Sequence, residues 1–393
     1  MTDYLLTFGC VEVSVKNLEN SESRAVDWQD YGRTTLVDYE HFQRSGVGFD
    51  EICAAHKVYE TLVGLWAPGV IEAADELGVF REIAKSSKTP AELAEVAGAG
   101  SHGMRILLDA LCVYGLLNRD VDDSDGYKYS LKPFFGSVVT GHGSASLIGK
   151  FLYDRQLAWP AWVNFVDAVR NSGDPDSGRQ ENQIPAGQYI HLTKGISFWA
   201  PPIVDVLCHR LEELGWSSSS EKHILDVGCG TGIYSHLLLR SFRGSQAIGL
   251  DVPEICRVAI ESASEFGVDD RFATREVDFW SEGWPKNQDL VVIANIFQML
   301  TPDSAKRLID LAASSLSESG VVCIVDQIRI GKAEFDTAQD RFAAVFAASM
   351  LATGGGDTFH LNQYDDWLES SDMHRIDLLD TPMHRIILAR SSV

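Results

Sequence analysis

Positive charge is scarce in this chain of 393 residues. Lys and Arg number 33 against 56 Asp and Glu, which gives a formal net charge of −23 at pH 7 and a pI near 4.8. A protein that binds nucleic acid needs a basic surface to neutralise phosphates. The composition therefore argues against a nucleic-acid partner.

Long apolar runs and paired cysteines are missing as well. No run approaches the roughly 18 apolar residues of a membrane span, and the N-terminus lacks the basic-then-apolar form of a secretory signal. The seven cysteines are scattered, without the short paired spacings of a disulfide framework or a zinc ribbon. We therefore expect a cytoplasmic protein that does not associate with membranes.

The most informative segment is ILDVGCGTGIYSHLLLRSFRGSQAIGLD, residues 224–251. An apolar run predicts a buried strand, glycines at alternate positions allow a tight turn into a helix, and a second apolar run ends at an acid. About 20 residues separate that acid from the last glycine, the spacing at which an acid holds ribose hydroxyls. The pattern indicates a nucleoside-binding βαβ unit.

The glycine spacing separates two ligand classes. A dinucleotide fingerprint reads G-x-G-x-x-G, but here the third glycine comes one place early and Ile233 fills its position. Asp226, the alternate glycines and the segment GLDVPE instead resemble the class I S-adenosylmethionine-dependent methyltransferases.

Two further landmarks follow in register. Val277-Asp278-Phe279 comes one βα unit after Asp251, and residues 289–297 predict another buried strand. Thr301 and Pro302 form a helix-start signal, and a strand over 320–325 ends at Asp326. This alternation predicts a doubly wound parallel sheet with the ligand at its carboxyl edge.

The region before the glycines is mostly helical in pattern. Apolar residues recur at helical spacing over 59–79, Thr89-Pro90-Ala91-Glu92 forms a capping box, and a helix is expected through residues 105–111. A polar turn over 120–126 precedes Tyr127–Leu131. Helices followed by a small hairpin predict a winged-helix module, although this one carries little positive charge.

Together the segments SHGMRILLDALCVYGLL, GYKYSLKPF and ILDVGCGTG resemble the small-molecule O-methyltransferases, the family of the caffeate, hydroxyindole and bacterial polyketide O-methyltransferases. The resemblance covers roughly residue 58 to the C-terminus and implies a homodimer formed through the N-terminal helices. We expect an α/β fold in three parts: residues 1–48, an extension of unknown role; 49–200, a mostly α winged-helix domain for dimerisation and substrate lining; and 201–393, a Rossmann-like doubly wound methyltransferase domain.

The resemblance also implies S-adenosyl-L-methionine as the cofactor and a set of residues that bind it. Asp251 would hold the ribose, an acid followed by an aromatic residue would contact the adenine, and the glycine amides would face the methionine moiety. The set comprises Asp226, Gly228, Gly230, Gly232, Asp251, Val252, Asp278, Phe279 and Asn295.

The catalytic position departs from the family pattern. The family places a histidine base in a segment reading L-H-D-W, whereas this chain has Phe297-Gln298-Met299-Leu300. Glutamine forms hydrogen bonds but takes no proton near neutral pH. The acceptor is then already an anion or an activated carbon, or it is a sulfur or amine that needs no base, or another residue is the base, or no methyl group is transferred.

Among these we rank O- or C-methylation of a small acidic or enolisable aromatic or keto acid first. Sulfur or nitrogen methylation comes second, and a hydroxylation or pericyclic rearrangement on the same scaffold comes third. A ligand-sensing scaffold without catalysis is the non-enzyme alternative, which the full cofactor set disfavours. A sensor would bind S-adenosylmethionine without ever forming S-adenosylhomocysteine.

Three histidines are candidates to replace the base, namely His191, His360 and His142. For each of them an ordinary structural role is the more frequent outcome. A metal site built from His191 and His360 ranks below a metal-free site, because no pair of ligands has the helical i,i+4 spacing.

An aromatic segment over residues 151–162 predicts part of the wall around the small-molecule acceptor. Most of its rings are expected to pack in the core. The family pattern implies that some line the acceptor site, where Arg155 would suit a carboxylate. The candidate acceptor-lining residues are Tyr153, Arg155, Trp159, Trp162 and Tyr189.

Overall fold

The computed structural model describes residues 49–121, 126–141, 143–172, 186–276, 280, 283–331, 335 and 337–392. Contacts between residues divide the chain into two compact units that meet between residues 151 and 152, whereas the sequence predicted a boundary at 200/201. The helices in between belong to the second unit because they contact its later helices: α9 (Trp159–Val163) and α10 (Phe165–Asn171) contact α16 (Ala338–Gly354), and α11 (Ala186–Gly195) contacts α14 (Pro253–Phe266).

The first unit is built from helices followed by a small hairpin, as predicted. Thr89 caps α5 by accepting from the Glu92 amide while the Glu92 carboxylate accepts from the Thr89 amide. The hairpin strands pair antiparallel. The elements are α2 (Phe49–Val63), α3 (Trp66–Glu76), α4 (Val79–Ile83), α5 (Pro90–Ala97), α6 (Ser101–Val113), β1 (Leu117–Val121), β2 (Tyr127–Leu131), α7 (Phe135–Thr140) and α8 (Ile148–Tyr153).

The second unit contains a seven-stranded sheet in the order β5-β4-β3-β6-β7-β9-β8. Its neighbours pair in parallel except around β9, which runs antiparallel to β7 and β8. The predicted doubly wound sheet is therefore confirmed. Its strands are β3 (His223–Val227), β4 (Gln246–Asp251), β5 (Phe272–Glu276), β6 (Gln288–Ala294), β7 (Leu316–Asp326), β8 (Met373–Asp380) and β9 (Arg385–Ser391).

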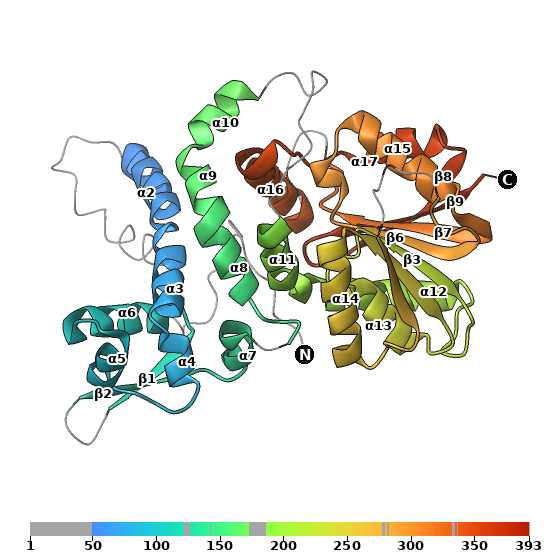
Figure 1. The fold of residues 1–393 in the computed structure, drawn as a ribbon. Coiled ribbons are helices and arrows are strands. Elements are labelled where there is room, and N and C mark those ends of the chain that lie inside the picture. Colours follow the sequence, from blue (N-terminus) through green and yellow to red (C-terminus); the bar gives the residue numbers. More distant parts are fainter. Residues whose placement is uncertain are drawn as a thin grey trace, which may run out of the picture. The chain divides into compact units, whose positions relative to one another are not determined.

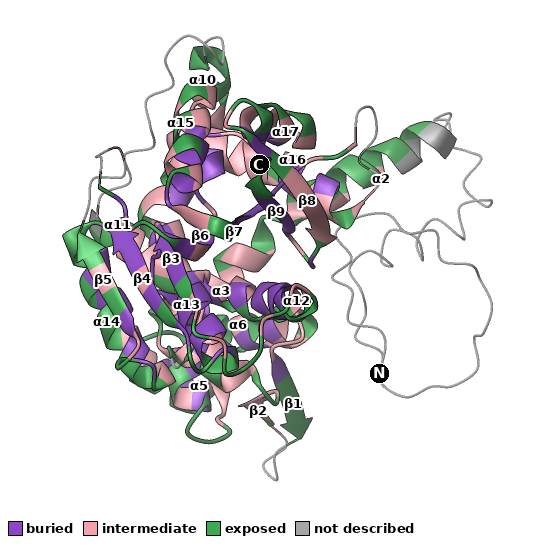
Figure 2. Cartoon of the chain, turned by 90° about the vertical axis from the view of Figure 1, so that its right-hand side faces the viewer, coloured by how far each residue is buried: buried purple, intermediate pink, exposed green. Residues whose placement is uncertain are grey.

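Helices cover both faces of this sheet (Figure 1). One apolar core joins the strands to α12 (Ala200–Glu213), α13 (Ile233–Ser241) and α14, and the other joins them to α15 (Pro302–Ala313) and α17 (Leu361–Glu369). The central strands β3 and β4 are buried along most of their length, while the covering helices expose their outer faces (Figure 2). The apolar runs follow from this two-sided burial.

The strand order reverses between β3 and β6, which are neighbours in the sheet although β4 and β5 separate them in the chain. In doubly wound sheets the ligand binds outside the carboxyl ends of the strands at such a switch point. Here those ends carry the glycine turn after β3, Asp251 at the end of β4, Asn295 after β6 and Asp326 at the end of β7.

Some sequence expectations fall outside the described residues, namely the segment Val277-Asp278-Phe279, His142 and the extension 1–48. Within the described residues, none of the helices has the length and apolar character to cross a membrane.

Two glycines are required by packing at the glycine turn. A Cβ on Gly249 in β4 would lie 2.7 Å from Cys229 Sγ, and one on Gly232 would lie 2.6 Å from the buried ring of His236. Gly232 also has a φ of 74°, in the left-handed region that favours glycine. The turn therefore sits closely against β4 and α13.

We predict that Gly249→Ala destabilises the protein. The added methyl group has no room beside Cys229, and overpacking a core costs about 1–3 kcal/mol. Urea unfolding followed by circular dichroism should show a lower midpoint at an unchanged slope. Gly187→Ala, a site in α11 with no atom within 4 Å of the new methyl, is the control. Equal midpoints for wild type and Gly249→Ala would contradict this account of the packing.

Candidate cofactor and acceptor site

The turn after β3 is held against the end of β4 by its own backbone. The amides of Gly228 and Cys229 both donate to the Leu250 carbonyl, at 2.9 and 3.1 Å. Gly228 and Gly230 have φ values of 68° and 56°, which other residues adopt at a cost. The glycines therefore give the turn its shape, and the bonds to Leu250 fix its position.

Asp251 joins this turn to the next loop. Its Oδ2 accepts from the Gly230 amide at 3.0 Å and its Oδ1 from the Val252 amide at 2.8 Å. The residue is only 2 % exposed, and burial raises its pKa to about 6. Val252, directly after it, keeps 39 % of its surface exposed, so an apolar side chain stands open beside the carboxylate.

Asp226 lies beneath the turn. Its Oδ2 accepts from Ser235 Oγ at 2.7 Å, and it is 1 % exposed. Burial raises its pKa to about 6. Since Ser235 is in the first turn of α13, the carboxyl group faces the positive end of that helix. The hydrogen bond from Ser235 therefore ties Asp226 to the helix that follows the glycine turn.

Helix α11 and the short helix η3 (Ser197–Trp199) both contribute side chains that lie near the glycine turn. A Cβ on Gly230 would lie 3.5 Å from Thr193 Cγ2, and Ser197 Oγ lies 3.2 Å from Thr231 Oγ1. Burial, together with the charge of Asp251, raises the pKa of Tyr189, so the phenol stays protonated. The sequence analysis identified Tyr189 but missed Thr193 and Ser197, which match no motif.

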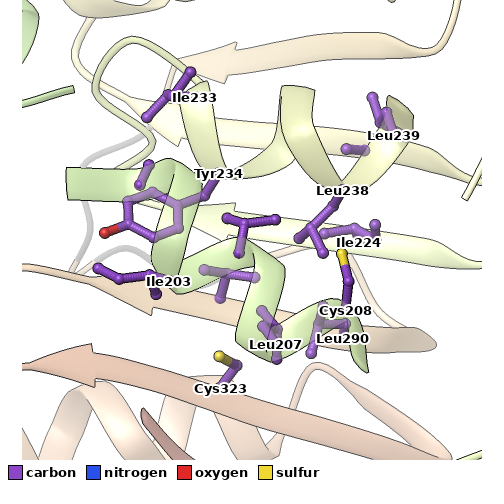
Figure 3. Close-up of a cluster of buried hydrophobic side chains, with 14 of the residues drawn as sticks. Ile203, Leu207, Cys208, Ile224, Ile233, Tyr234, Leu238, Leu239, Leu290 and Cys323 are labelled. Carbon is purple, nitrogen blue, oxygen red and sulfur yellow. The ribbon is translucent and has the colours of Figure 1, made fainter. Parts of the chain in front are cut away.

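The loop after β6 begins with a residue in an unusual conformation. Asn295 has a φ of 58°, and its main-chain oxygen accepts from Gln298 Nε2 at 2.7 Å. Its side-chain Nδ2 donates to Tyr234 Oη at 3.3 Å, while its Oδ1 lies 2.8 Å from His384 Nε2. The hydroxyl of Tyr234 extends beyond the apolar cluster of α12 and α13, in the direction of the strand arrowheads (Figure 3).

Gln298 lies in η4 (Phe297–Met299) and is 6 % exposed. Its Nε2 is occupied by Asn295, but its buried Oε1 has no hydrogen-bond partner among the described residues. Its main-chain oxygen accepts from the Asp357 amide at 3.1 Å, and a Cβ on Gly356 would collide with that oxygen. The position expected to hold the base is thus a rigid, buried amide.

Asp326 supports this loop. One carboxylate oxygen accepts from the Phe297 amide at 3.0 Å and the other from the Gln327 amide at 2.8 Å. Burial raises its pKa to about 7. The third buried acid of this edge therefore fixes the segment that carries Gln298.

The two described histidine candidates differ in their surroundings. His360 is the N-cap of α17, where its main-chain oxygen accepts from the Gln363 amide and its own amide donates to Gln363 Oε1, each at 2.9 Å. Burial, with the nearby charge of Arg329, lowers its pKa. His191 lies in α11 and is half-buried. The structure thus gives His360 a capping task.

The predicted aromatic segment forms the end of α8, the π-helical turn η2 (Asp154–Ala158) and α9. Tyr153 is buried and hydrogen-bonded to Thr353 of α16, whereas Trp162 is 37 % exposed and packs on Phe165, with ring centroids 4.9 Å apart. Arg155 lies in η2 and Trp159 begins α9. Both η2 and α9 contact α16.

The chemistry of this edge fits a cationic nucleoside better than a dinucleotide. It offers the buried carboxyl groups of Asp226 and Asp251, backbone amides and the open side chain of Val252. Buried acids repel a pyrophosphate but suit ribose hydroxyls and a positively charged ligand. Among the described residues, no group of three His, Cys, Asp or Glu side chains could hold a metal ion.

Comparisons with known proteins agree with this geometry. Residues 59–134 match the family model of the O-methyltransferase dimerisation domain, and residues 224–320 match that of a methyltransferase domain. The chain is 25% identical over 323 residues to 3-hydroxy-5-methyl-1-naphthoate 3-O-methyltransferase of Streptomyces sahachiroi, covering 78% of this chain and 86% of that protein. It is also 25% identical to L-tyrosine C(3)-methyltransferase of Streptomyces lavendulae, covering 84% and 90%.

The fold is likewise similar to solved structures. Human N-acetylserotonin methyltransferase in complex with SAM superposes with a TM-score of 0.72 at 18% identity, covering 86% of this chain and 97% of that one. The chain thus carries an O-methyltransferase dimerisation domain followed by a methyltransferase domain. It is an S-adenosylmethionine-dependent methyltransferase.

We predict that Asp251→Asn weakens cofactor binding at least about 10-fold without unfolding the protein. An asparagine cannot accept from both the Gly230 and Val252 amides, and a lost hydrogen bond to a charged group is worth about 1.5–3 kcal/mol. Calorimetric titration with S-adenosylhomocysteine measures the effect. Asp270→Asn, which removes an exposed carboxylate, is the control, and unchanged binding by Asp251→Asn would show that the pocket is elsewhere.

Cofactor binding should also weaken as the pH falls from about 7.5 to about 5. The pKa values of Asp226 and Asp251 stand at about 6 without ligand. A bound cation favours their charged forms, so binding at low pH must first remove protons. Calorimetry with S-adenosylmethionine, in buffers of different ionisation enthalpy, counts the protons released. An affinity that stays constant down to pH 5 would contradict the assignment.

Proposed function

We propose that this enzyme transfers the methyl group to an oxygen or carbon atom of a small acidic or enolisable aromatic or keto acid, in secondary metabolism. The observation that carries the proposal is Gln298, a buried amide that is held by Asn295 and whose Oε1 has no hydrogen-bond partner in the described part of the chain. An amide does not take a proton near neutral pH. In this proposal the acceptor reaches the site already ionised or as an activated carbon.

The cofactor supplies an electrophilic methyl group on a sulfonium centre. The chain's part is binding, alignment and exclusion of water, which account for much of the rate in such a displacement. Asp251 and the glycine turn would hold the nucleoside, and the turn is contacted by Thr193 of α11 and by Ser197 of η3 (Ser197–Trp199). Gln298 would orient the acceptor through its Oε1, which can accept from a hydroxyl or N–H group that the acceptor carries besides its ionised oxygen or activated carbon.

The relatives support this acceptor class. Two of them are named for a naphthoate and for tyrosine, each an aromatic compound that carries a carboxylate, and they are named as O- and C-methyltransferases respectively. A single scaffold that serves both atoms is consistent with a site that relies on an acceptor already activated.

The same amide favours a second candidate, methylation of sulfur or nitrogen. A thioether or neutral amine attacks through a lone pair and needs no base beforehand. Gln298 could then accept from an amine N–H.

We further propose a homodimer in the cytoplasm. Residues 59–134 match a dimerisation domain, and α2 and α3 expose large apolar side chains that a second copy would cover, namely Val58, Tyr59, Leu62, Leu65 and Trp66. Cys112, Cys208, Cys229, Cys256 and Cys323 are free thiols, as in a reducing compartment.

Substitution of Gln298 tests the proposal. In Gln298→Ala we expect kcat to fall about 10- to 100-fold, because one orienting hydrogen bond is lost, while S-adenosylhomocysteine binds as before. In Gln298→His the pH–rate profile should gain an ionisation near the imidazole value of about 6.5. Gln246→Ala, an exposed glutamine at the amino end of β4, is the control. A loss of about 10⁴-fold or more in Gln298→Ala would show that the side chain acts directly in chemistry.

Substitution of Arg155 tests whether the acceptor carries a carboxylate. Arg155→Ala should raise the KM of a carboxylate-bearing acceptor about 10-fold or more, since a charge-assisted hydrogen bond is removed, and leave the KM for S-adenosylmethionine within about twofold. Steady-state kinetics with each substrate varied in turn gives both values. Equal changes in the two KM values would contradict a role at the acceptor.

A further inference from the structure

A buried polar cluster at the carboxyl edge joins three segments that are far apart in the chain. His384 precedes β9, Gln327 follows β7 and Asn295 follows β6. Asn295 Oδ1 lies 2.8 Å from His384 Nε2 and 3.3 Å from Gln327 Nε2. His384 and Gln327 are each 1 % exposed, so the protein itself must satisfy their polar atoms.

The hydrogen bonds of this cluster depend on the His384 tautomer. His384 Nε2 lies 2.8 Å from Asn295 Oδ1 and also 2.8 Å from Gln327 Nε2, and one ring nitrogen cannot donate to the first and accept from the second. Burial lowers the pKa of His384 to about 3, which keeps the ring neutral. With its proton on Nε2 the ring donates to Asn295 Oδ1, and the Nδ2 group of Asn295 then faces the other way, toward Tyr234.

On that other side lies Tyr234. Its Oη accepts from Asn295 Nδ2 at 3.3 Å, which leaves the phenol's own hydrogen and the second hydrogen of Nδ2 to donate elsewhere. The described residues provide no further hydrogen-bond partner for either atom. Burial raises the pKa of Tyr234, so the O–H donor persists at any working pH. The Tyr234 hydroxyl points toward the carboxyl ends of the strands (Figure 3).

The cluster is held rigidly from behind. The His384 ring packs against Trp199 with centroids 4.9 Å apart, and Trp199 in turn contacts Phe342 and Phe346 of α16. Asn295 itself has a left-handed backbone, a conformation that persists only where its surroundings fix it. A fixed, neutral donor pair costs little reorganisation when it meets a negative charge.

We propose that Tyr234 Oη–H and Asn295 Nδ2–H form a neutral donor pair for an anionic oxygen of the bound ligands, and that His384 and Gln327 are positioning residues that aim it. Two sources share this chemistry: the ionised oxygen of the acceptor and the carboxylate of the cofactor. The first rests on the proposed function and would complement Gln298, since donors stabilise an acceptor that arrives as an anion. The second does not depend on methyl transfer.

Calorimetry with two nucleosides tests the pair. S-adenosylhomocysteine carries the amino-acid carboxylate, and 5′-methylthioadenosine lacks it. If the cofactor is the source, Asn295→Ala and Tyr234→Phe bind S-adenosylhomocysteine about 10- to 100-fold more weakly and bind 5′-methylthioadenosine as wild type does. Asn295→Asp, which keeps Oδ1 but replaces the donor by a negative oxygen, should weaken S-adenosylhomocysteine further.

If the acceptor is the source, both nucleosides bind these variants normally. The probe is then 4-nitrophenol, added to protein saturated with S-adenosylhomocysteine and titrated by absorbance. Wild type should bind the phenolate and lower the pKa of the phenol below its value in free solution, and Asn295→Ala and Tyr234→Phe should abolish the shift. His384→Phe keeps the packing on Trp199 but loses the donor to Asn295, so it should reproduce part of either effect. Asn118→Ala, in the hairpin of the first unit, is the control.

Two results would overturn the proposal. One is an equal loss of affinity for both nucleosides in Asn295→Ala, which would mean that the amide only supports the turn. The other is wild-type behaviour of all the variants toward both nucleosides and 4-nitrophenol. Neither result bears on whether the enzyme transfers methyl groups, because no turnover is measured.

Discussion

The carboxylate of Asp251 ends β4 and accepts two backbone amides, one from the residue that follows it and one from the glycine turn after the neighbouring strand β3. The arrangement of the other residues at the carboxyl edge of the sheet depends on these two hydrogen bonds. It fixes the turn whose glycines adopt left-handed conformations, and it places a buried acid beside the exposed side chain of Val252. The same constraint appears in the packing: β4 lies so close to the turn that position 249 requires glycine.

A second strand-end carboxylate accepts two backbone amides in the same way on the other side of the switch point. Asp326 ends β7, accepts the amide of Gln327 after it, and accepts the amide of Phe297 from the loop after the neighbouring strand β6. Both acids are buried and both have raised pKa values. One acid thus fixes the glycine turn and the other fixes the segment with Gln298, so two strand-end carboxylates hold the loops on either side of the switch point.

Sequence patterns predicted the sheet because its strands are buried on both faces and its turn needs glycine. The capping box at Thr89 and the helix start at Thr301 were also confirmed, since both signals are local. The cluster around His384 could not be predicted, because its members come from three segments and match no motif. The tasks of the predicted site residues remain predictions, and Asp278 and Phe279 lie outside the described residues.

The unit boundary shows where local patterns reach their limit. Residues 152–200 are helical, as expected, but they belong with the sheet unit because α9, α10 and α11 contact α14 and α16. Helical periodicity predicts that a face is buried without saying against which partner. The contacts of Thr193 and Ser197 with the glycine turn could not be predicted for the same reason.

The most direct test of the account is product analysis with methyl-labelled S-adenosylmethionine and a pool of phenols, keto acids, thioethers and amines. Mass spectrometry of S-adenosylhomocysteine and of labelled products identifies both the transfer and the atom that receives the methyl group. The account predicts label on an oxygen or carbon of an acidic or enolisable member of the pool. Cofactor binding without any transfer, or label confined to sulfur or nitrogen, would contradict it.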